Sequence, residues 1–302
     1  MVPADGPVRP RGRQARLREA AMWETLDDLY WTYQSLIHGI GVNGILALSI
    51  YVVLAVGQLS LGQAAFMGVG AYTGALLTVK AGVPFPVAMA GAAAVPALIA
   101  LVVGGPTLRL TGVYLAIATI GLGEITRIVF LNWDYAGGAL GLSGIPEKGG
   151  VGAIYGTLAA ALLALVLIAR SRIGRAMEAM REDEAAAGVM GVNLPRYRMT
   201  ALVVSSALAG LAGCLSAHVS SFIGPNEYGF ETAVTILSYA LLGGIGSPVA
   251  PVLGAAILTL LPEVLRPLAD FRLMVNGLII VLAVLFMPRG ILPWRIARTG
   301  AR

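Results

Sequence analysis

The sequence is poor in ionisable and reactive side chains. Charged residues make up 12% of the 302 positions, about half the share of an average soluble domain. The one cysteine, Cys214, cannot form a disulfide within the chain, so no disulfide framework is expected. The two histidines, His38 and His218, stand outside any HExxH spacing. We therefore expect no catalytic residue and no metal site in this chain.

A phosphate-binding loop is also missing. No GxxxxGK[ST] motif occurs, and the only lysines are Lys80 and Lys148. The chain thus lacks the Walker A loop that cradles nucleotide phosphates, and we expect it to bind no cofactor. If ATP drives the protein, another subunit must bind the nucleotide. The net charge of +5 does not indicate nucleic-acid binding, because the basic residues gather in tails and loops, where membrane topology explains them.

Apolar residues, by contrast, are abundant. They make up 57% of the chain and form segments that approach the about 20 residues a helix needs to cross a bilayer. Nine such segments lie near residues 38–56, 60–79, 85–104, 110–131, 151–169, 199–223, 231–246, 249–265 and 273–288. We predict an all-α polytopic membrane protein whose transmembrane domain covers residues 38–293.

Two flanking regions are expected around this domain. Residues 1–18 carry five arginines and little apolar surface, which predicts a disordered basic tail. Residues 19–37 alternate apolar and charged side chains at helical spacing but are too charged to span, so we predict an interfacial amphipathic helix. A soluble helix packed on a partner is the alternative. Residues 294–302 form a second basic tail.

The distribution of arginine predicts the orientation. Arginines concentrate in both tails and in the loop 170–198, so the positive-inside rule places these regions in the cytoplasm. The loop 132–150 then lies outside. An odd number of spans must precede that loop, yet four apolar segments do. We therefore predict that residues 60–79 enter and leave on the outer side, giving about eight spans plus one broken or re-entrant segment.

The composition around this segment fits an interrupted helix. Residues 57–74 read GQLSLGQAAFMGVGAYTG, with five glycines and several polar side chains. Non-helical backbone at membrane depth is tolerated where it is buried in protein or lines a wet cavity, and interrupted helices border transport paths. The alternative is a tightly packed helix whose small residues let neighbouring helices approach closely.

Polar side chains near this stretch are the candidates for lining a transport path. They are Gln58, Ser60, Gln63, Tyr72, Thr119 and Glu124. Glu124 precedes Arg127 by three residues, so an ion pair on one helix face is the alternative to substrate contact. The apolar segments otherwise hold few ionisable groups, which argues against a proton- or sodium-driven carrier.

The loop 170–198 carries the pattern of a docking element. Its residues Arg175, Glu178, Arg181 and Glu184 step by three, which predicts a charged ladder on one helix. Met177 and Met180 would add apolar contacts, and Gly188 and Gly191 suit the end of a helix. We predict a short cytoplasmic helix that docks a soluble protein. A solvated loop helix without a partner is the alternative.

Several stretches together resemble one family. They are GQLSLGQAAFMGVGAYTGALL (57–77), LRLTGVYLAIATIGLGEITRIVFLNWD (108–134), GLSGIP (141–146), SRIGRAMEAMREDEAAAGVMGVN (171–193), LLGGIGSPVAPVLGAA (241–256) and MPRGIL (287–292). The chain resembles the permease subunits of bacterial branched-chain amino acid ABC importers, particularly the LivM type. It departs from them at Gln63, where the family often has histidine, and in the stretch 224–230.

The resemblance implies a function and an assembly. The chain would be a permease subunit in the bacterial cytoplasmic (inner) membrane, with both termini cytoplasmic. It would form the path for branched-chain amino acids or a related small solute, with urea and short amides left open. The partners implied are a second, LivH-type permease, two cytoplasmic ATPases that bind ATP, and an extracytoplasmic solute-binding protein.

The resemblance also assigns the coupling loop. The residues expected to contact the ATPases are Gly174, Arg175, Glu178, Arg181, Glu182, Asp183, Glu184 and Gly191. Two other functions remain open from the residues alone. One is an ion-coupled secondary carrier that works without an ATPase, and the other is a membrane scaffold that transports nothing.

Overall fold

The computed structural model describes residues 11–264, 277, 290 and 291, and for residues 11–32 only the backbone. The chain divides into two units, residues 1–37 and 38–302. Residues 1–10, all but residue 277 of the ninth apolar segment 273–288, and the tail 294–302 lie outside the described residues.

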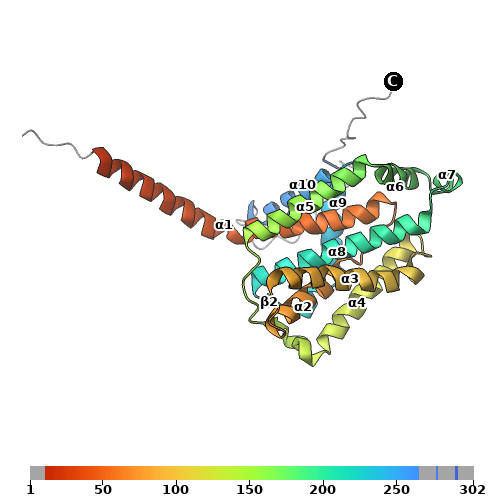
Figure 1. Cartoon of the computed structure of the whole chain (residues 1–302), viewed down its shortest axis with the longest axis horizontal. Helices are drawn as coiled ribbons and strands as arrows, with labels where there is room; N and C mark the ends of the chain where they lie inside the picture. The colour runs from red at the N-terminus through yellow and green to blue at the C-terminus, as the bar shows by residue number, and fades with distance from the viewer. Residues whose placement is uncertain (1–10, 265–276, 278–289, 292–302) are drawn as a thin grey trace, which may run out of the picture. The chain divides into compact units, whose positions relative to one another are not determined.

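The described residues are mostly helical, with only two very short strands among them, which confirms the all-α prediction (Figure 1). The helices are α1 (Arg11–Ala55), α2 (Gln63–Val79), α3 (Phe85–Thr107), α4 (Val113–Leu131), α5 (Val151–Arg170), α6 (Arg172–Glu182), α7 (Glu184–Val189), α8 (Leu194–Ser220), α9 (Phe230–Gly243) and α10 (Val249–Val264). Short 3-10 helices are η1 (Asp134–Ala136), η2 (Gly138–Leu140) and η3 (Pro225–Tyr228). The strands β1 (Leu142–Ser143) and β2 (Phe222–Ile223) form one antiparallel pair.

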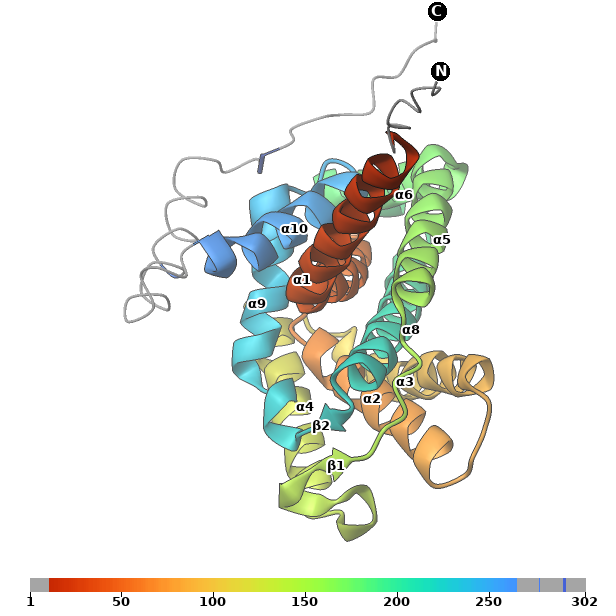
Figure 2. The same cartoon turned by 90° about the vertical axis from the view of Figure 1, so that its left-hand side faces the viewer.

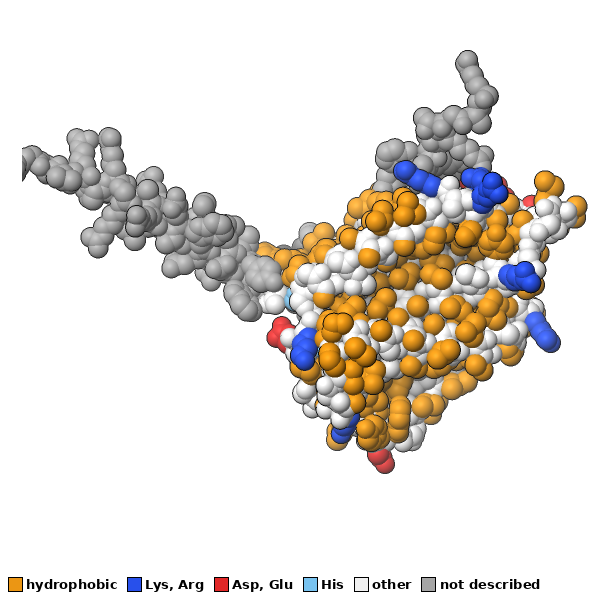
Figure 3. Space-filling view, in the orientation of Figure 1, with side chains coloured by type: hydrophobic (Ala, Val, Ile, Leu, Met, Phe, Trp, Pro, Cys, Tyr) orange, Lys and Arg blue, Asp and Glu red, His pale blue; other side chains and the backbone are white. Residues whose placement is uncertain are grey.

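Five of these helices are long and apolar enough to cross a membrane. They are residues Tyr33–Ala55 of α1, and α3, α4, α5 and α8. Helices α2, α9 and α10 are apolar but shorter, at 17, 14 and 16 residues. Figure 3 shows hydrophobic side chains over most of the visible face of the bundle, with Lys and Arg toward its ends. The polytopic membrane class is therefore confirmed.

The first helix begins earlier than expected. It starts at Arg11, inside the stretch that we predicted to be disordered up to residue 18, and runs to Ala55 without a break at residue 37. Alanine, arginine, leucine and glutamate dominate residues 11–20, and these are good helix formers. The interfacial, amphipathic character of residues 19–37 stays a prediction.

The bundle of unit 38–302 has two ends. The first holds α6 and α7 and is called the α6 end; the other holds the loop 132–150 and η3 and is called the opposite end. Gly41 of α1 lies against Ile154, near the start of α5, at the opposite end. At Gly57, just after α1, a Cβ would lie 3.5 Å from the Cα of Arg181 in α6. Residues 38–55 therefore run from the opposite end to the α6 end.

Helix α2 then runs back. Near its C-terminus, Thr78 Oγ1 lies 3.1 Å from Nε2 of His218, which is two residues before the end of α8. The predicted re-entrant course of residues 60–79 is therefore wrong, because the chain enters this segment from Gly57 at the α6 end and leaves it at the opposite end. The prediction required residues 38–55 to start on the cytoplasmic side, whereas this segment starts at the end of the bundle opposite to α6.

The later helices keep alternating between the ends (Figures 1 and 2). At the end of α3, a Cβ at Gly104 would meet Met199, near the start of α8. Arg127 of α4 reaches Asn226 of η3 at the opposite end. The carbonyl of Ile245, after α9, lies at the α6 end, and Thr259 of α10 returns to Asn43 of α1. Among the described residues, α1 (from residue 38), α3, α4, α5, α8, α9 and α10 thus run between the two ends, and α2 does so together with the non-helical residues 56–62.

Small residues allow α2 to pack closely against both α3 and α8, which also contact each other. A Cβ at Gly70 would collide with the backbone of Gly210, and one at Gly213 with the carbonyl oxygen of Met67. A Cβ at Gly210 would in turn collide with the carbonyl oxygen of Ala92 in α3. The tightly packed helix, the alternative for residues 57–74, is therefore right from residue 63 onward. The interruption is confined to residues 56–62.

Candidate transport path

The segment between α1 and α2 is non-helical because of its local chemistry. Gly57 has φ +76°, a backbone conformation that glycine adopts without strain. The N–H of Gln58 donates to the carbonyl of Val53 and closes the turn after α1. The N–H of Leu61 donates to Thr119 Oγ1 of α4 at 2.9 Å, and the N–H of Gly62 to Ser60 Oγ at 3.3 Å. Side chains thus satisfy part of this backbone.

Four predicted path residues meet around this segment. The side chains of Gln58, Ser60, Gln63 and Thr119 are all buried, with residue exposures of 1–4%. Gln63 Nε2 donates to Ser205 Oγ of α8 at 3.2 Å, and Ser205 Oγ lies 3.2 Å from Ser49 Oγ of α1. Gln63 Oε1 and both amide atoms of Gln58 have no hydrogen-bond partner among the described residues. Buried polar atoms without a hydrogen-bond partner are rare in native proteins, so each of these atoms needs a structural or functional reason.

The N-terminus of α2 lies deep in the bundle. Ser205, which accepts the hydrogen bond from the first residue of α2, Gln63, lies within α8. At 1.5 Å per residue, it is about 16 Å from the start of α8 and about 22 Å from the end of α8. With 17 residues, α2 is about 25 Å long, shorter than the roughly 30 Å hydrocarbon core. The non-helical residues 56–62 therefore complete the passage toward the α6 end, as in the discontinuous helices that border transport sites.

A small cavity lies beside this N-terminus. It is lined by the polar residues Gln58, Ser60, Thr107 and Thr119 and by apolar side chains of α2, α3, α4 and α8. Its volume of about 10 Å³ has room for about one water molecule. The path is therefore closed at this level in the structure.

Tyr72 belongs to a separate, aromatic cluster nearer the opposite end. Its ring stacks on Phe130 of α4, with centroids 3.9 Å apart, and meets the ring of Tyr228 edge-on at 6.2 Å. Tyr72 is 1% exposed, and within the described part of the chain its hydroxyl has no hydrogen-bond partner. The three rings fill the space between α2, α4 and η3. Beside them, burial raises the pKa of Glu227, a shift that a backbone hydrogen bond at Gly224 partly offsets.

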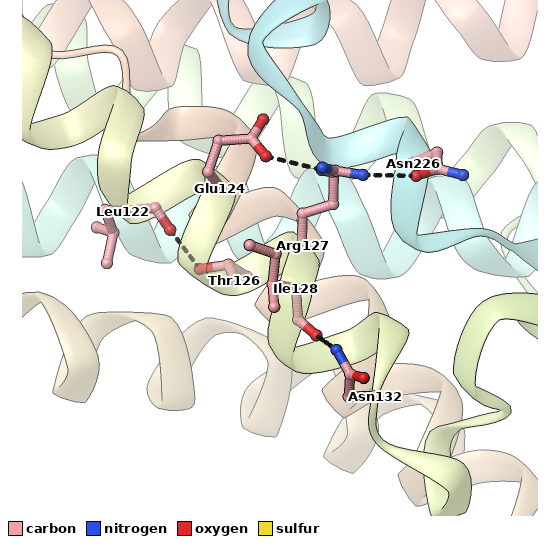
Figure 4. A network of polar contacts seen from close by, with 7 residues as sticks. All are labelled: Leu122, Glu124, Thr126, Arg127, Ile128, Asn132 and Asn226. Atoms are coloured by element: carbon pink, nitrogen blue, oxygen red, sulfur yellow. Dashed lines mark hydrogen bonds and ion pairs between the residues drawn. The ribbon is translucent and has the colours of Figure 1, made fainter.

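Glu124 lies in neither of these two clusters. Its carboxylate accepts a 2.9 Å hydrogen bond from Arg127 Nε, and Arg127 Nη1 donates to Asn226 Oδ1 at 3.0 Å (Figure 4). The ion pair predicted within α4 is confirmed. Both side chains are partly exposed, at 41% and 31%, so the pair contributes about 0–1 kcal/mol. Through the hydrogen bond from Arg127 to Asn226, this group of side chains connects α4 to η3.

The loop 170–198 forms two helices where one was predicted. The side chain of Ser171 caps α6, and Asp183 Oδ1 accepts from the N–H of Ala186 to cap α7. Asp183 is extended, with φ −151°, which breaks the helix between Glu182 and Glu184. α7 ends at Val189, and Gly191 follows with φ +86°. The glycines Gly188 and Gly191 predicted that a helix ends here.

The predicted charged ladder is wrong. Because Asp183 divides the two helices, Glu184 turns away from α6 and pairs with Arg198 of α8. Arg181 Nη1 donates instead to the carbonyl of Ile245 at 3.0 Å. Met180, which we expected to offer apolar contacts to a partner, is 4% exposed and packs inside the chain. Gly174 packs against the backbone of Ala169, at the end of α5.

Other residues of the loop remain on the surface. Val189 and Met190 are 89% and 84% exposed, and the side chains of Arg175, Glu178, Glu182 and Asp183 are exposed too. A cleft of about 950 Å³ lies between α6, the ends of α1 and α5, and residues 245–248. It is lined partly by Arg175, Glu178, Arg181 and Glu182.

Comparison with known proteins identifies the family. Residues 34–286 match the family model described as "Branched-chain amino acid transport system / permease component". The chain belongs to this family. It is a family of transport permeases, not of enzymes. No solved structure matches the chain.

Two LivM proteins are similar over most of their length. The high-affinity branched-chain amino acid transport system permease protein LivM of Escherichia coli (strain K12) is 34% identical, over 89% of this chain and 70% of that protein. LivM of Salmonella typhimurium is also 34% identical, over 85% and 67%. LivH of Escherichia coli (strain K12) is 33% identical over 44% of each chain. The resemblance to LivM-type permeases is thus confirmed.

Within this permease, sequence reasoning missed the tertiary partners of the path residues. Ser205 and Ser49 sit in apolar helices with no local signal, yet Ser205 accepts a hydrogen bond from the amide of Gln63 and contacts Ser49 in turn. Phe130 and Tyr228 lie far from Tyr72 in the chain. Interspersed polar residues identified Gln58, Ser60, Gln63 and Thr119, but no spacing in the sequence reveals which helices meet them.

Proposed function

We propose that this permease forms, with a second permease subunit, the membrane path of an ATP-driven importer of branched-chain amino acids in the bacterial cytoplasmic membrane. The observation that carries the proposal is membership of the branched-chain amino acid permease family across residues 34–286. The buried amides around the interrupted helix α2 support it, because a polar path must pass through an otherwise apolar bundle.

The proposed partners follow from the relatives and from the absence of a Walker A motif. Similarity to both LivM and LivH supports a pair of permease subunits. ATP would be bound by two soluble ATPases at the α6 end, where the exposed residues of α6 and α7 offer a contact surface. A solute-binding protein would deliver the substrate at the opposite end, near η1, η2 and η3.

The test is reconstitution of the four kinds of subunit in liposomes. We expect leucine, with the solute-binding protein outside, to stimulate ATP hydrolysis and to be taken up. A chain without the ATPases should take up nothing, which is the matched control. Uptake driven by a proton or sodium gradient without ATP would contradict the proposal and favour a secondary carrier. If no branched-chain amino acid stimulates ATP hydrolysis, the proposed substrate is wrong.

A further inference from the structure

The N-terminus of α2 is buried and has no cap. Its N-cap residue is Gly62, which has no side chain to accept a hydrogen bond. Among the described hydrogen bonds, none gives an acceptor to the N–H groups of Gln63, Ala64 and Ala65. Ala64 and Ala65 are each 1% exposed, so bulk water does not reach these groups. Such N–H groups are normally satisfied by a cap, water or a ligand.

Gln58 provides a second, independent observation at the same place. Its side chain is 4% exposed, lines the cavity beside α2, and finds no partner for either amide atom in the part of the chain that the structure describes. A buried amide without partners costs about 1–3 kcal/mol relative to a satisfied one. Ser60, in the same cavity, accepts from the N–H of Gly62 and retains its own O–H to donate.

The charge of the surroundings favours an anion. A helix N-terminus carries roughly half a positive charge, and its N–H groups bind carboxylates and phosphates. The residues that line the cavity include amide, hydroxyl and apolar side chains but no acidic one. Glu124, on the same helix as Thr119, is paired with Arg127 and does not line the cavity.

We propose that the N-terminus of α2, with Gln58 and Ser60, receives the carboxylate of the transported solute midway through the bundle. The inference rests on the proposed function and specifies the chemical group that this permease recognises. The N–H groups of α2, the amide of Gln58 and the hydroxyl of Ser60 donate to the carboxylate. A solute with a carboxylate therefore fits this site better than a neutral amide or urea does.

The site has to open before it can bind. Its volume of about 10 Å³ holds about one water, which is less than a carboxylate needs. The facing helix is α4, and the hydrogen bond from the N–H of Leu61 to Thr119 Oγ1 joins the two sides. Separation of α4 from residues 57–62 breaks this bond and frees the N–H of Leu61 for the solute.

Cysteine protection tests the proposal. The one native cysteine is buried, so Ser60→Cys in a Cys214→Ala chain gives a single reporter. The complete permease–ATPase complex is placed in nanodiscs without the solute-binding protein, whose selectivity is thereby removed. A membrane-permeant maleimide is added with leucine or with leucinamide, which differ only in the carboxylate. Thr73→Cys, a partly exposed position on α2 outside the cavity, is the matched control.

We expect leucine, and not leucinamide, to protect the cysteine. At about ten times its dissociation constant, leucine leaves about a tenth of the sites free, so labelling slows about tenfold. Labelling of Thr73→Cys should not change. Gln58→Glu, added to Ser60→Cys, should abolish protection because the carboxylates repel, while the complex stays assembled. Thr119→Cys, on the facing helix, is the second reporter in case Ser60→Cys fails to fold.

Three results would overturn the proposal. One is equal protection by leucine and leucinamide, or protection by neither, in a complex whose ATP hydrolysis leucine stimulates; the proposed function would then stand without this site. Another is protection that Gln58→Glu leaves unchanged. The third is that neither cysteine reacts in the absence of solute. If leucine does not stimulate the wild-type complex, the proposed substrate itself fails, and this inference fails with it.

Discussion

Gly70 fixes the distance between α2 and α8. A Cβ at this position would collide with the Cα and the carbonyl group of Gly210, and backbone cannot move aside as a side chain can. We expect Gly70→Ala to destabilise the protein by about 1–3 kcal/mol through overpacking. The unfolding temperature of the detergent-solubilised chain measures this. Gly123→Ala in α4, where a Cβ would meet nothing within 4 Å, is the matched control. Equal unfolding temperatures for both variants would contradict the packing described.

Cys214 is predicted to be inert in the folded protein. Its side chain is fully buried, next to Gly74 of α2 and His218 of its own helix. We expect a maleimide to label it only after unfolding in detergent, whereas Glu182→Cys, at an exposed position, should react in the native state. Mass spectrometry of the labelled chain gives both results. Rapid labelling of native Cys214 would show that α8 is more accessible than the structure indicates.

At the scale of single residues, the sequence predicted the polar lining well and its partners poorly. Gln58 and Ser60 stand out because amides and hydroxyls are rare in apolar runs, and burial confirms that they lie inside. The prediction that Arg181 pairs with acidic residues near it in the sequence is wrong, because Arg181 has a partner in a distant part of the chain. A carbonyl 64 residues away, at Ile245, accepts its hydrogen bond, and helical spacing carries no information about such a partner.

Among the elements, α2 shows which structural features its own sequence can predict and which it cannot. Its glycines predicted both of the arrangements that the structure contains, an interruption at residues 56–62 and close packing from residue 63 onward. The direction of the element could not follow from its own residues. It depended on where α1 begins, and that assumption came from arginines in a different unit of the chain.

The α6–α7 pair is where we expect the ATPase to bind, and α7 exposes the apolar residues that it needs. Val189 and Met190 are 89% and 84% exposed at the tip of this element. Val189→Asp with Met190→Asp should greatly reduce co-purification of the ATPase, because both changes introduce charge into an apolar contact. Arg181 and Glu184 are poorer test positions, since each is bonded within the chain.

The matched control is Leu140→Asp. Leu140 is also 89% exposed, but it lies in η2 at the opposite end, where the proposed ATPase does not bind. This variant should retain the ATPase. Unchanged co-purification in the Val189→Asp, Met190→Asp chain would place the ATPase elsewhere. Loss of the ATPase in all variants would indicate a general defect of the fold.

For the whole molecule, the two ends of the bundle differ in chemistry as well as in contacts. The arginines of the loop 170–198 gather at the α6 end, which the positive-inside rule assigns to the cytoplasm. Residues 38–55 then descend from the outer face. The orientation of the N-terminus, which belongs to the separate unit 1–37, stays a prediction.

Accessibility from the two faces distinguishes this arrangement from a re-entrant α2. Ala55 lines the cleft beside α6, whereas a re-entrant segment 60–79 would place the end of α1 at the outer face. In a Cys214→Ala background, we expect Ala55→Cys and Glu182→Cys to be blocked only by a reagent added from the cytoplasmic side. Ala81→Cys, exposed between α2 and α3, and Lys148→Cys should be blocked from outside. Impermeant maleimides on right-side-out and inverted vesicles measure this. Blocking of Ala55→Cys together with Ala81→Cys from outside would restore the re-entrant course, because only then do both ends of α2 share one face.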